Sequence, residues 1–387
     1  MKKKKLYDVI VVGGGPSGLN TARLLTDNNL EVLILEAKNS VGKDVVCTGI
    51  VGIDTFRRFN ISKKSVLYEP QAIELISPSG DKIFYNHPFP FASVVSREIF
   101  DNQLLEQAVK NGAQLSLNSR VFDISHEKNY ISVTYATPEI PKETIKGRFV
   151  VIATGINYNL NKLLGLGFPK YFLKAVQGYG YFKNGDKNNI KILVANGIAK
   201  NGFGWVVPID NNIARVGLIT DGDPEKGFEY IRNTFYSEPS ALIPESLRYK
   251  PIAQGIVSKT FGERVIAVGE AAGQIKTTTG GGLYFGLLCS ELASKTIKEA
   301  FEENDFSTER LSIYEKQWKF LISEEIKKGM IIRKLCGRLR DRQIEKLFKI
   351  VKSDGFFDYI AKNADFNWHS IFVLNLYKKI KGFYTDS

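Results

Sequence analysis

The sequence predicts an α/β fold: a parallel sheet that is interrupted by an inserted antiparallel sheet and followed by a C-terminal helical region. A β-branched apolar run from Tyr7 to Val12 enters a glycine-rich turn and then a helical pattern. Two later apolar runs, Phe149 to Ala153 and Val265 to Val268, have the same profile, which is typical of parallel strands covered on both faces. Between them, residues 171–256 are strand-like and aromatic, with Gly and Asn at turns.

Length and composition bound the class of protein. The 387 residues allow two or three domains, and 43% hydrophobic with 24% charged residues excludes a disordered chain. Three scattered cysteines and three scattered histidines indicate neither a disulfide framework nor a metal site. No run reaches the roughly 18–20 apolar residues that span a bilayer, and the first residues do not read as a secretory signal. We therefore expect a cytoplasmic protein, or one on the cytoplasmic face of a membrane.

The net charge of +12 favours acidic partners. These include nucleic acid, anionic lipid, phosphorylated metabolites and acidic electron-transfer proteins, and the alternative is a lysine-rich solvated surface. No nucleic-acid-binding motif occurs in the chain, so nucleic acid is not expected as a partner.

The turn after the first strand carries a dinucleotide-binding fingerprint. Gly13 permits the tight turn, Gly15 lets the backbone approach a pyrophosphate, and Gly18 lets the helix pack on the strand. Pro16 and Ser17 open the helix, whose free N–H groups and positive dipole end face the phosphates.

A second strand, Val32 to Leu35, ends at Glu36 and Ala37. The Glu36 carboxylate, about 20 residues after the glycine turn, can accept hydrogen bonds from a ribose and would repel a 2′-phosphate. Strand, glycines, helix, strand and acid in this order are a strong signal for a dinucleotide, but they do not distinguish NAD from FAD.

Two later segments resemble fingerprints of FAD proteins of the p-hydroxybenzoate hydroxylase type. They are Thr154-Gly155, and Gly269-Glu270 with the small residues that follow. The resemblance implies a Rossmann-like FAD-binding domain, in which the second acid binds the ribityl chain of FAD. That acid is usually aspartate; Glu270 is one methylene longer and keeps the charge.

Residues 269–288, GEAAGQIKTTTGGGLYFGLL, narrow the resemblance to the geranylgeranyl reductase family of flavoproteins. Gly280, Gly281 and Gly282 allow the backbone to pass flush against a flat ring, and Leu283 begins a helical pattern. A helix N-terminus directed at the flavin would stabilise the negative charge that reduction places there.

Further matches extend the resemblance over about residues 5–300. Cys47-Thr48-Gly49 is similar to the family's cysteine-containing loop, Arg97 lies in a segment like its flavin-contacting arginine helix, and Val121 matches a position whose backbone meets the adenine. Cys47 is the candidate proton donor or flavin neighbour; the alternative is a small buried hydrophobe. For Arg97 the alternative is a residue on a helix surface.

These motifs predict a discontinuous organisation. The FAD-binding domain comprises residues 1–70, 93–160 and 257–300, a substrate-binding β-sheet domain comprises 71–92 and 161–256, and 301–387 form a helical region. The second domain holds a hairpin at 72–85, a helix at 225–235 and the segment GFGWVVP. This segment resembles an aromatic signature of the family, although Phe203 replaces its tyrosine and Val207 its second aromatic. Phe203, Trp205 and Pro208 are candidates for contact with an apolar substrate; core packing is the alternative.

The resemblance implies an FAD-dependent reductase that saturates carbon–carbon double bonds of geranylgeranyl-type isoprenoid lipids or prenyl pyrophosphates. One alternative is a monooxygenase or halogenase of the same fold, but residues 154–158 lack the Asp-Gly motif those enzymes commonly have. Another is a flavoprotein that only carries electrons. No second glycine fingerprint or cysteine cluster occurs, so we expect a diffusing electron donor, either NAD(P)H or a ferredoxin-like protein.

The basic stretch 327–349 predicts two short helices or one bent helix, because its two groups of apolar residues point in different directions. Such a surface could touch an anionic membrane, with a solvated helical cap as the alternative. The cations expected to face lipid are Lys327, Lys328, Arg333, Lys334, Arg338, Arg340 and Arg342.

Overall fold

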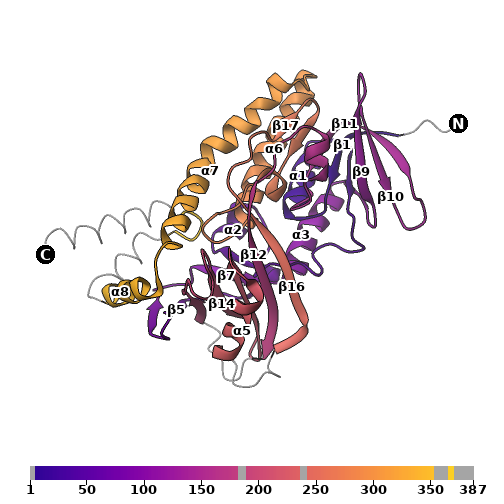
Figure 1. The fold of residues 1–387 in the computed structure, drawn as a ribbon. Helices are drawn as coiled ribbons and strands as arrows, with labels where there is room; N and C mark the ends of the chain where they lie inside the picture. Colours follow the sequence, from indigo (N-terminus) through magenta and orange to yellow (C-terminus); the bar gives the residue numbers. More distant parts are fainter. Residues whose placement is uncertain (1–4, 182–188, 236–241, 353–364, 370–387) are drawn as a thin grey trace.

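The computed structural model describes residues 5–181, 189–235, 242–352 and 365–369, and it has the predicted α/β architecture. None of the helices within these ranges is long and apolar enough to cross a bilayer. Figure 1 shows a larger sheet with its helices, a second sheet below it, and the long helix α7 running beside both.

The larger sheet has a parallel centre. Its strand order is β17-β18-β11-β1-β2-β8, and the antiparallel hairpin of β9 and β10 is attached to β11. The strands are β1 (Leu6–Val12), β2 (Val32–Leu35), β8 (Gln114–Ser116), β9 (Arg120–His126), β10 (Ile131–Ala136), β11 (Glu143–Ile152), β17 (Phe261–Gly262) and β18 (Val265–Ala267). The three apolar runs of the sequence thus lie side by side, as β1, β11 and β18.

Helices cover this sheet and bury its apolar residues. Val9 and Val11 pack in one core cluster with α1, α3, α6 and α7, while Ile10 and Val12 belong to a cluster on the other face. Because both faces are covered, the strand is apolar throughout. The four helices are α1 (Pro16–Thr26), α3 (Arg97–Lys110), α6 (Leu283–Glu303) and α7 (Thr308–Cys336). The helix starts expected near Pro16, Arg97 and Leu283 are confirmed.

The second sheet has the order β16-β12-β15-β14-β13-β5-β6. Its strands are β5 (Ala72–Ile76), β6 (Lys82–Asn86), β12 (Tyr171–Tyr181), β13 (Asn189–Leu193), β14 (Phe203–Pro208), β15 (Ile213–Thr220) and β16 (Leu242–Gln254). The predicted hairpin is β5–β6, and the predicted helix is α5 (Pro224–Phe235). One pairing departs from the antiparallel expectation: β13 runs parallel to β5, because the hairpin joins the sheet from a distant part of the chain.

Smaller elements connect the two sheets. A three-strand ladder consists of β3 (Ile50–Gly52), β4 (Val66–Tyr68) and β7 (Ala92–Val95). The short helices are α2 (Thr55–Arg58), α4 (Asn159–Leu163), η1 (Lys63–Ser65) and η3 (Gly269–Ala272). The second sheet draws strands from 72–86 and 171–254, in agreement with the interruption seen in the sequence; the division into domains at the stated residues stays a prediction.

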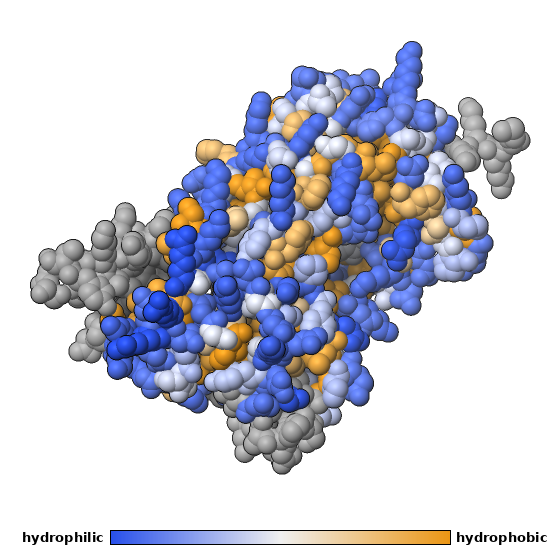
Figure 2. Space-filling view, viewed as in Figure 1, coloured by the Kyte–Doolittle hydropathy of each residue, from blue (hydrophilic) through white to orange (hydrophobic). Residues whose placement is uncertain are grey.

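The basic stretch forms two helices, since α7 ends at Cys336 and α8 (Asp341–Val351) follows. Ile344 and Phe348 of α8 pack on Ile83 of the hairpin, so α8 covers the end of the second sheet. Figure 2 shows hydrophilic side chains interspersed with apolar ones over the surface where α7 lies in Figure 1. Phe320, Ile331 and Leu335 are exposed on this helix.

Arg333 was expected among the cations that face lipid, and this expectation is wrong. Its side chain is buried, with only 8% of its surface exposed. Its Nε donates to the Thr277 carbonyl at 2.7 Å, and its two terminal nitrogens donate to the carbonyls of Asn201 and Thr278. Because successive side chains of a helix point about 100° apart, this arginine faces inward while its neighbour Lys334 is exposed. Arg333 therefore supports a loop of the protein and cannot face a membrane.

Candidate functional site

A cavity of about 1090 Å³ lies between the two sheets. The turns after β1, β2 and β11 line one part of it, through Gly13, Glu36 and Gly155. Strands of the second sheet line another part, through residues such as Trp205 and Ile219. Clefts at the carboxyl ends of parallel strands are the usual ligand site in open α/β sheets, and this volume suits a large ligand.

The fingerprint glycines have separate structural reasons. Gly13 has φ +113°, and a Cβ there would lie 2.3 Å from the Ala153 carbonyl oxygen. At Gly18 a Cβ would lie 2.2 Å from the Gly13 carbonyl oxygen, so this glycine permits the close approach of helix and strand. At Gly15 nothing lies within 4 Å of the added atom. The first and third glycines are thus needed by the fold, and the second leaves open space at the N-terminus of α1, which fits a pyrophosphate.

Glu36 lies where the fingerprint expects its acid. Its Oε2 accepts from the Gly14 backbone N–H at 2.6 Å, and its Oε1 accepts from the Lys38 N–H at 2.8 Å. These bonds fix the carboxylate at the end of β2, on the cavity wall. A fixed carboxylate beside the glycine turn fits the ribose of a dinucleotide.

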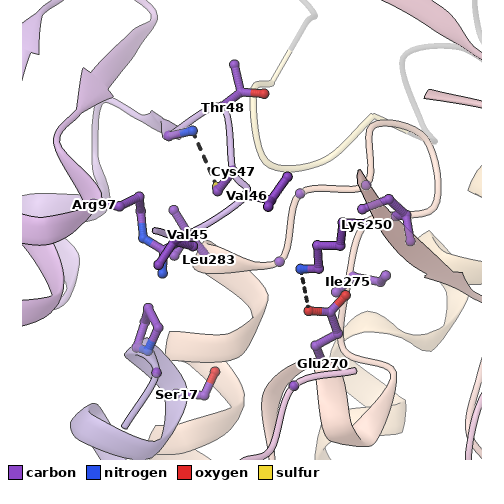
Figure 3. Close-up of a pocket in the computed structure, with 18 of the residues that line it drawn as sticks. Ser17, Val45, Val46, Cys47, Thr48, Arg97, Lys250, Glu270, Ile275 and Leu283 are labelled. Carbon is purple, nitrogen blue, oxygen red and sulfur yellow. Dashed lines mark hydrogen bonds and ion pairs between the residues drawn. The ribbon is translucent and has the colours of Figure 1, made fainter. Parts of the chain in front are cut away.

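The thiol loop, residues 45–49, brings Cys47 and Thr48 to the cavity (Figure 3). The Cys47 Sγ accepts from the Gly49 backbone N–H at 3.3 Å. Arg97, at the start of α3, lies beside the thiol and is held by Asp101 through bonds of 3.0 and 2.8 Å. Burial raises the pKa of the Cys47 thiol, but Arg97, the Gly49 N–H and Lys250 outweigh it, and the pKa is lowered overall. A thiol with a lowered pKa in a cavity is a candidate acid.

Glu270 lies on the opposite part of the site, where its Oε2 pairs with Lys250 Nζ at 2.8 Å (Figure 3). Lys250 comes from β16 and Glu270 from η3, so this ion pair joins the second sheet to the segment that follows β18. Sequence reasoning did not find Lys250, because a single lysine in a strand has no characteristic spacing.

The glycine loop, residues 276–282, ends at the N-terminus of α6 and lines the cavity. Gly280 has φ +76°, which favours glycine. Lys276 was also missed by sequence reasoning. It is buried, it donates to the Phe366 carbonyl at 2.9 Å and to Asn367 Oδ1 at 3.0 Å, and burial lowers its pKa to about 8.

Nearly all residues predicted for the site line this one cavity, although they are scattered over the sequence. The exceptions are Gly18, Gly269 and Pro208. Gly269 packs on Ser17, since a Cβ there would lie 2.4 Å from its Oγ. Along β14, Phe203, Trp205 and Val207 face the cavity, and Pro208 points to the other side because strand residues alternate. Which of the lining residues touch a cofactor or substrate stays a prediction.

Apolar side chains dominate the wall that the second sheet provides. Ile190 and Ile192 of β13, Ile219 of β15 and Ile252 of β16 lie there beside Trp205. Tyr85 of β6 and His87 and Phe91, which follow this strand, add aromatic surface that the sequence did not indicate, since the segment was predicted only to contain a hairpin. Such a wall suits an apolar ligand.

Comparisons with known proteins agree with this geometry. A family profile of pyridine nucleotide-disulphide oxidoreductases matches residues 7–195. The digeranylgeranylglycerophospholipid reductase of Methanocaldococcus jannaschii is 27% identical over 362 residues, covering 88% of this chain and 90% of the relative. The digeranylgeranylglycerophospholipid reductase 1 of Methanococcoides burtonii is 26% identical and covers 98% of each chain.

Solved structures extend the comparison to the fold. A geranylgeranyl bacteriochlorophyll reductase-like protein from Thermoplasma acidophilum superposes with a TM-score of 0.82 at 22% identity, covering 90% of this chain and 92% of that one. The p-nitrophenol 4-monooxygenase PnpA from Pseudomonas putida gives a TM-score of 0.72 at 18% identity, covering 93% and 98%. The fold is therefore shared between reductases and oxygenases.

The glycine turn, the fixed Glu36 carboxylate and the open space at the start of α1 fit FAD, the cofactor that the resemblance implied. The motif order, the arrangement of the sheets and these comparisons confirm the resemblance to the geranylgeranyl reductase family, and the protein is an FAD-dependent oxidoreductase with the fold of the p-hydroxybenzoate hydroxylase-like flavoproteins.

Proposed function

We propose that the protein saturates carbon–carbon double bonds in the isoprenoid chains of lipids of the digeranylgeranylglycerophospholipid type or of prenyl pyrophosphates. The observation that carries the proposal is the juxtaposition of an apolar wall and an acidic thiol in one cavity beside the glycine turn. The names of the relatives support the same substrate class.

The residues that would hold FAD follow from the site. The turn at Gly13–Gly18 would bind the pyrophosphate, Glu36 a ribose, Glu270 the ribityl chain, and residues 280–282 the flat ring. Arg97 and Val121 complete the predicted set. When bound in this site and reduced, FAD would supply the hydride for the double bond.

Cys47 supplies the proton. An isolated alkene is a poor base, so the second carbon must receive a proton from a nearby acid as the first accepts hydride. The Sγ–H bond of Cys47 breaks and a C–H bond forms, and the guanidinium of Arg97 stabilises the thiolate that remains. The thiolate then regains a proton from water. Each turnover thus adds two hydrogens to one double bond, and a diffusing donor restores the two electrons.

The second sheet orients the chain and excludes water. The rings of Phe203 and Trp205 pack at a tilt, with 5.9 Å between their centroids, and they face the cavity with isoleucines of neighbouring strands. A dry wall strengthens the electrostatic effect of Arg97 on the thiol, because the local dielectric is low.

The test is the mass of the product. Incubation with a geranylgeranyl lipid and dithionite should give products heavier by two hydrogens per double bond. Unchanged mass across several prenyl lipids and pyrophosphates would overturn the proposal. Rapid NAD(P)H-driven oxygen consumption with a hydroxylated product would instead assign a monooxygenase.

Two further expectations concern partners. The positive net charge would attract an acidic electron-transfer protein, so we expect reduction by a ferredoxin-like donor to slow as salt rises. Salt-independent reduction would contradict this electrostatic attraction.

The exposed cations of α7 and its C-terminal end would attract anionic lipid, each by roughly 1 kcal/mol or less. The variant Lys334→Gln, Arg338→Gln, Arg340→Gln keeps the buried Arg333 and removes three exposed charges. It should sediment less with anionic vesicles than the wild type, at equal FAD content. Equal sedimentation of both proteins would mean that this surface is only solvated.

A further inference from the structure

Arg215 is a buried cation on β15 whose hydrogen bonds leave its own sheet. The residue is 6% exposed, and its Nη1 donates to the Thr48 carbonyl at 2.6 Å and to the Val95 carbonyl at 3.1 Å. Its Nε has no hydrogen-bond partner within the described ranges. Removing a guanidinium from water is costly unless good hydrogen bonds compensate. Arg215 is therefore placed where two backbone carbonyls need a donor.

The two carbonyls belong to the segments that carry Cys47 and Arg97. Thr48 follows the thiol, and Val95 ends β7, two residues before Arg97 begins α3. These segments are also joined directly, because the Val95 N–H donates to the Gly49 carbonyl at 2.7 Å. One side chain thus bridges the loop of the candidate acid and the helix of its cationic neighbour.

The junction has no room for a side chain at position 49. Gly49 has φ +68°, and a Cβ there would lie 2.7 Å from both Arg215 Nη1 and the Val95 carbonyl oxygen. A second contact comes from β12, the strand next to β15. The Thr48 Oγ1 donates to Gln177 Oε1 at 3.0 Å, and Gln177 Nε2 donates to the Cys47 carbonyl at 3.4 Å. Two neighbouring strands of the second sheet therefore hold the thiol loop.

We propose that Arg215 is a positioning residue that fixes the thiol loop against the start of α3, so that the Cys47 Sγ stays beside the guanidinium of Arg97. Arg215 acts through backbone carbonyls and does not itself line the cavity. The charged groups that act on Cys47 are Arg97 of α3 and Lys250 of β16, whose partners are Asp101 and Glu270. The consequence for catalysis rests on the proposed function, but the position of the thiol does not.

The test measures the reactivity of the thiol without any prenyl substrate. In FAD-loaded protein, the rate of Cys47 alkylation by iodoacetamide is followed against pH by peptide mass spectrometry, because only the thiolate reacts. In Arg215→Met we expect the midpoint to rise toward that of a free thiol, about 8.5, and the rate at neutral pH to fall at least about threefold. The exposed Cys336 serves as an internal reference whose rate should not change.

Arg248→Met is the matched control. Arg248 lies on β16 of the same sheet, opposite Gln177, and also donates to backbone carbonyls, but it is exposed and these carbonyls, of Glu245 and Leu247, belong to its own strand and not to the thiol loop. This variant should keep the wild-type midpoint. A shift as large as that of Arg215→Met would overturn the proposal, since any arginine of the sheet would then have the same effect.

A wild-type midpoint in FAD-loaded Arg215→Met would overturn the proposal directly. If that variant does not retain FAD, the same alkylation midpoint is measured in Arg215→Lys. The shorter lysine keeps the charge but cannot bridge both carbonyls. A smaller upward shift supports the proposal, and an unchanged midpoint contradicts it. Shifted alkylation together with unchanged product masses would refute the proposed function alone, and product formation with unshifted alkylation would refute this inference alone.

Discussion

The thiol loop and the glycine loop both line the cavity, and each is held by a buried arginine from a different part of the chain. Arg215 of β15 donates to carbonyls at both ends of the junction between the thiol loop and α3. Arg333 of α7 donates to the carbonyls of Thr277 and Thr278 at the start of the glycine loop. The first arginine belongs to the sheet that forms the apolar wall, and the second to a helix outside both sheets.

The difference between the loops lies in what each one presents. The thiol loop brings a side chain that can donate a proton, the Cys47 thiol, to the cavity. Residues 280–282 of the glycine loop bring only their backbone there. Substitutions around the thiol loop should therefore change turnover, and substitutions that loosen the glycine loop should change the binding of FAD. This separation can be tested.

The largest effect is expected at Cys47. Cys47→Ala removes the proposed proton donor, and loss of a general acid typically costs about 10²–10⁴-fold in rate. We expect product formation, measured by mass, to fall within that range while the FAD content stays normal. Cys336→Ala, at an exposed cysteine, is the control and should retain full activity. Loss of FAD in Cys47→Ala would show that the thiol loop also supports the cofactor. The two loops would then not differ in function as proposed.

A smaller effect, of the other kind, is expected at Arg333. Arg333→Met leaves the carbonyls of Thr277 and Thr278 without their donor, and a hydrogen bond to a charged group contributes about 1.5–3 kcal/mol. We expect FAD to bind roughly tenfold more weakly, as measured by fluorescence titration of the apoprotein. Lys334→Met changes the exposed neighbour and should bind FAD as the wild type does. Equal dissociation constants for both variants would mean that α7 does not support the loop.

The smallest effect is a pH dependence at Lys276. Burial lowers its pKa to about 8, from 10.5 in the unfolded chain, so between these values the unfolded state binds more protons than the folded state. The free energy of unfolding should therefore rise with pH, by about 1 kcal/mol between roughly pH 7 and 9. The groups that oppose this shift by their charge are Asp365, Glu325 and Asp54.

Lys276→Met should lack this dependence. We expect the urea unfolding curves of wild type and variant to converge or cross as pH rises, because the buried charge penalises only the wild type, and only at lower pH. Parallel pH profiles for the two proteins would contradict the lowered pKa. They would leave the lysine as a simple anchor for Phe366 and Asn367.

Local patterns allowed much of the site to be predicted. The strand that ends at Val12, the helix starts at Pro16, Arg97 and Leu283, and the break between α7 and α8 all follow from short-range periodicity and turn chemistry. Pro208 was expected to contact the substrate, but it does not line the cavity. Side chains alternate along β14, and that of Pro208 points away from the cavity. A sequence motif indicates the strand but not which of its residues share a face of the sheet.

The sequence by itself determined the cofactor fingerprint, the two loops and the order in which the strands follow one another, because each of these rests on residues close together in the chain. Only the tertiary structure decided that Arg215, Lys250, Lys276 and Arg333 belong to the site. A single basic residue in a strand or helix has no spacing signal, and the partners of these four side chains lie between 20 and 167 residues away in the sequence. Their hydrogen bonds join loops to the second sheet, to α7 and to the segment around Phe366, so they depend on how these parts of the chain pack together.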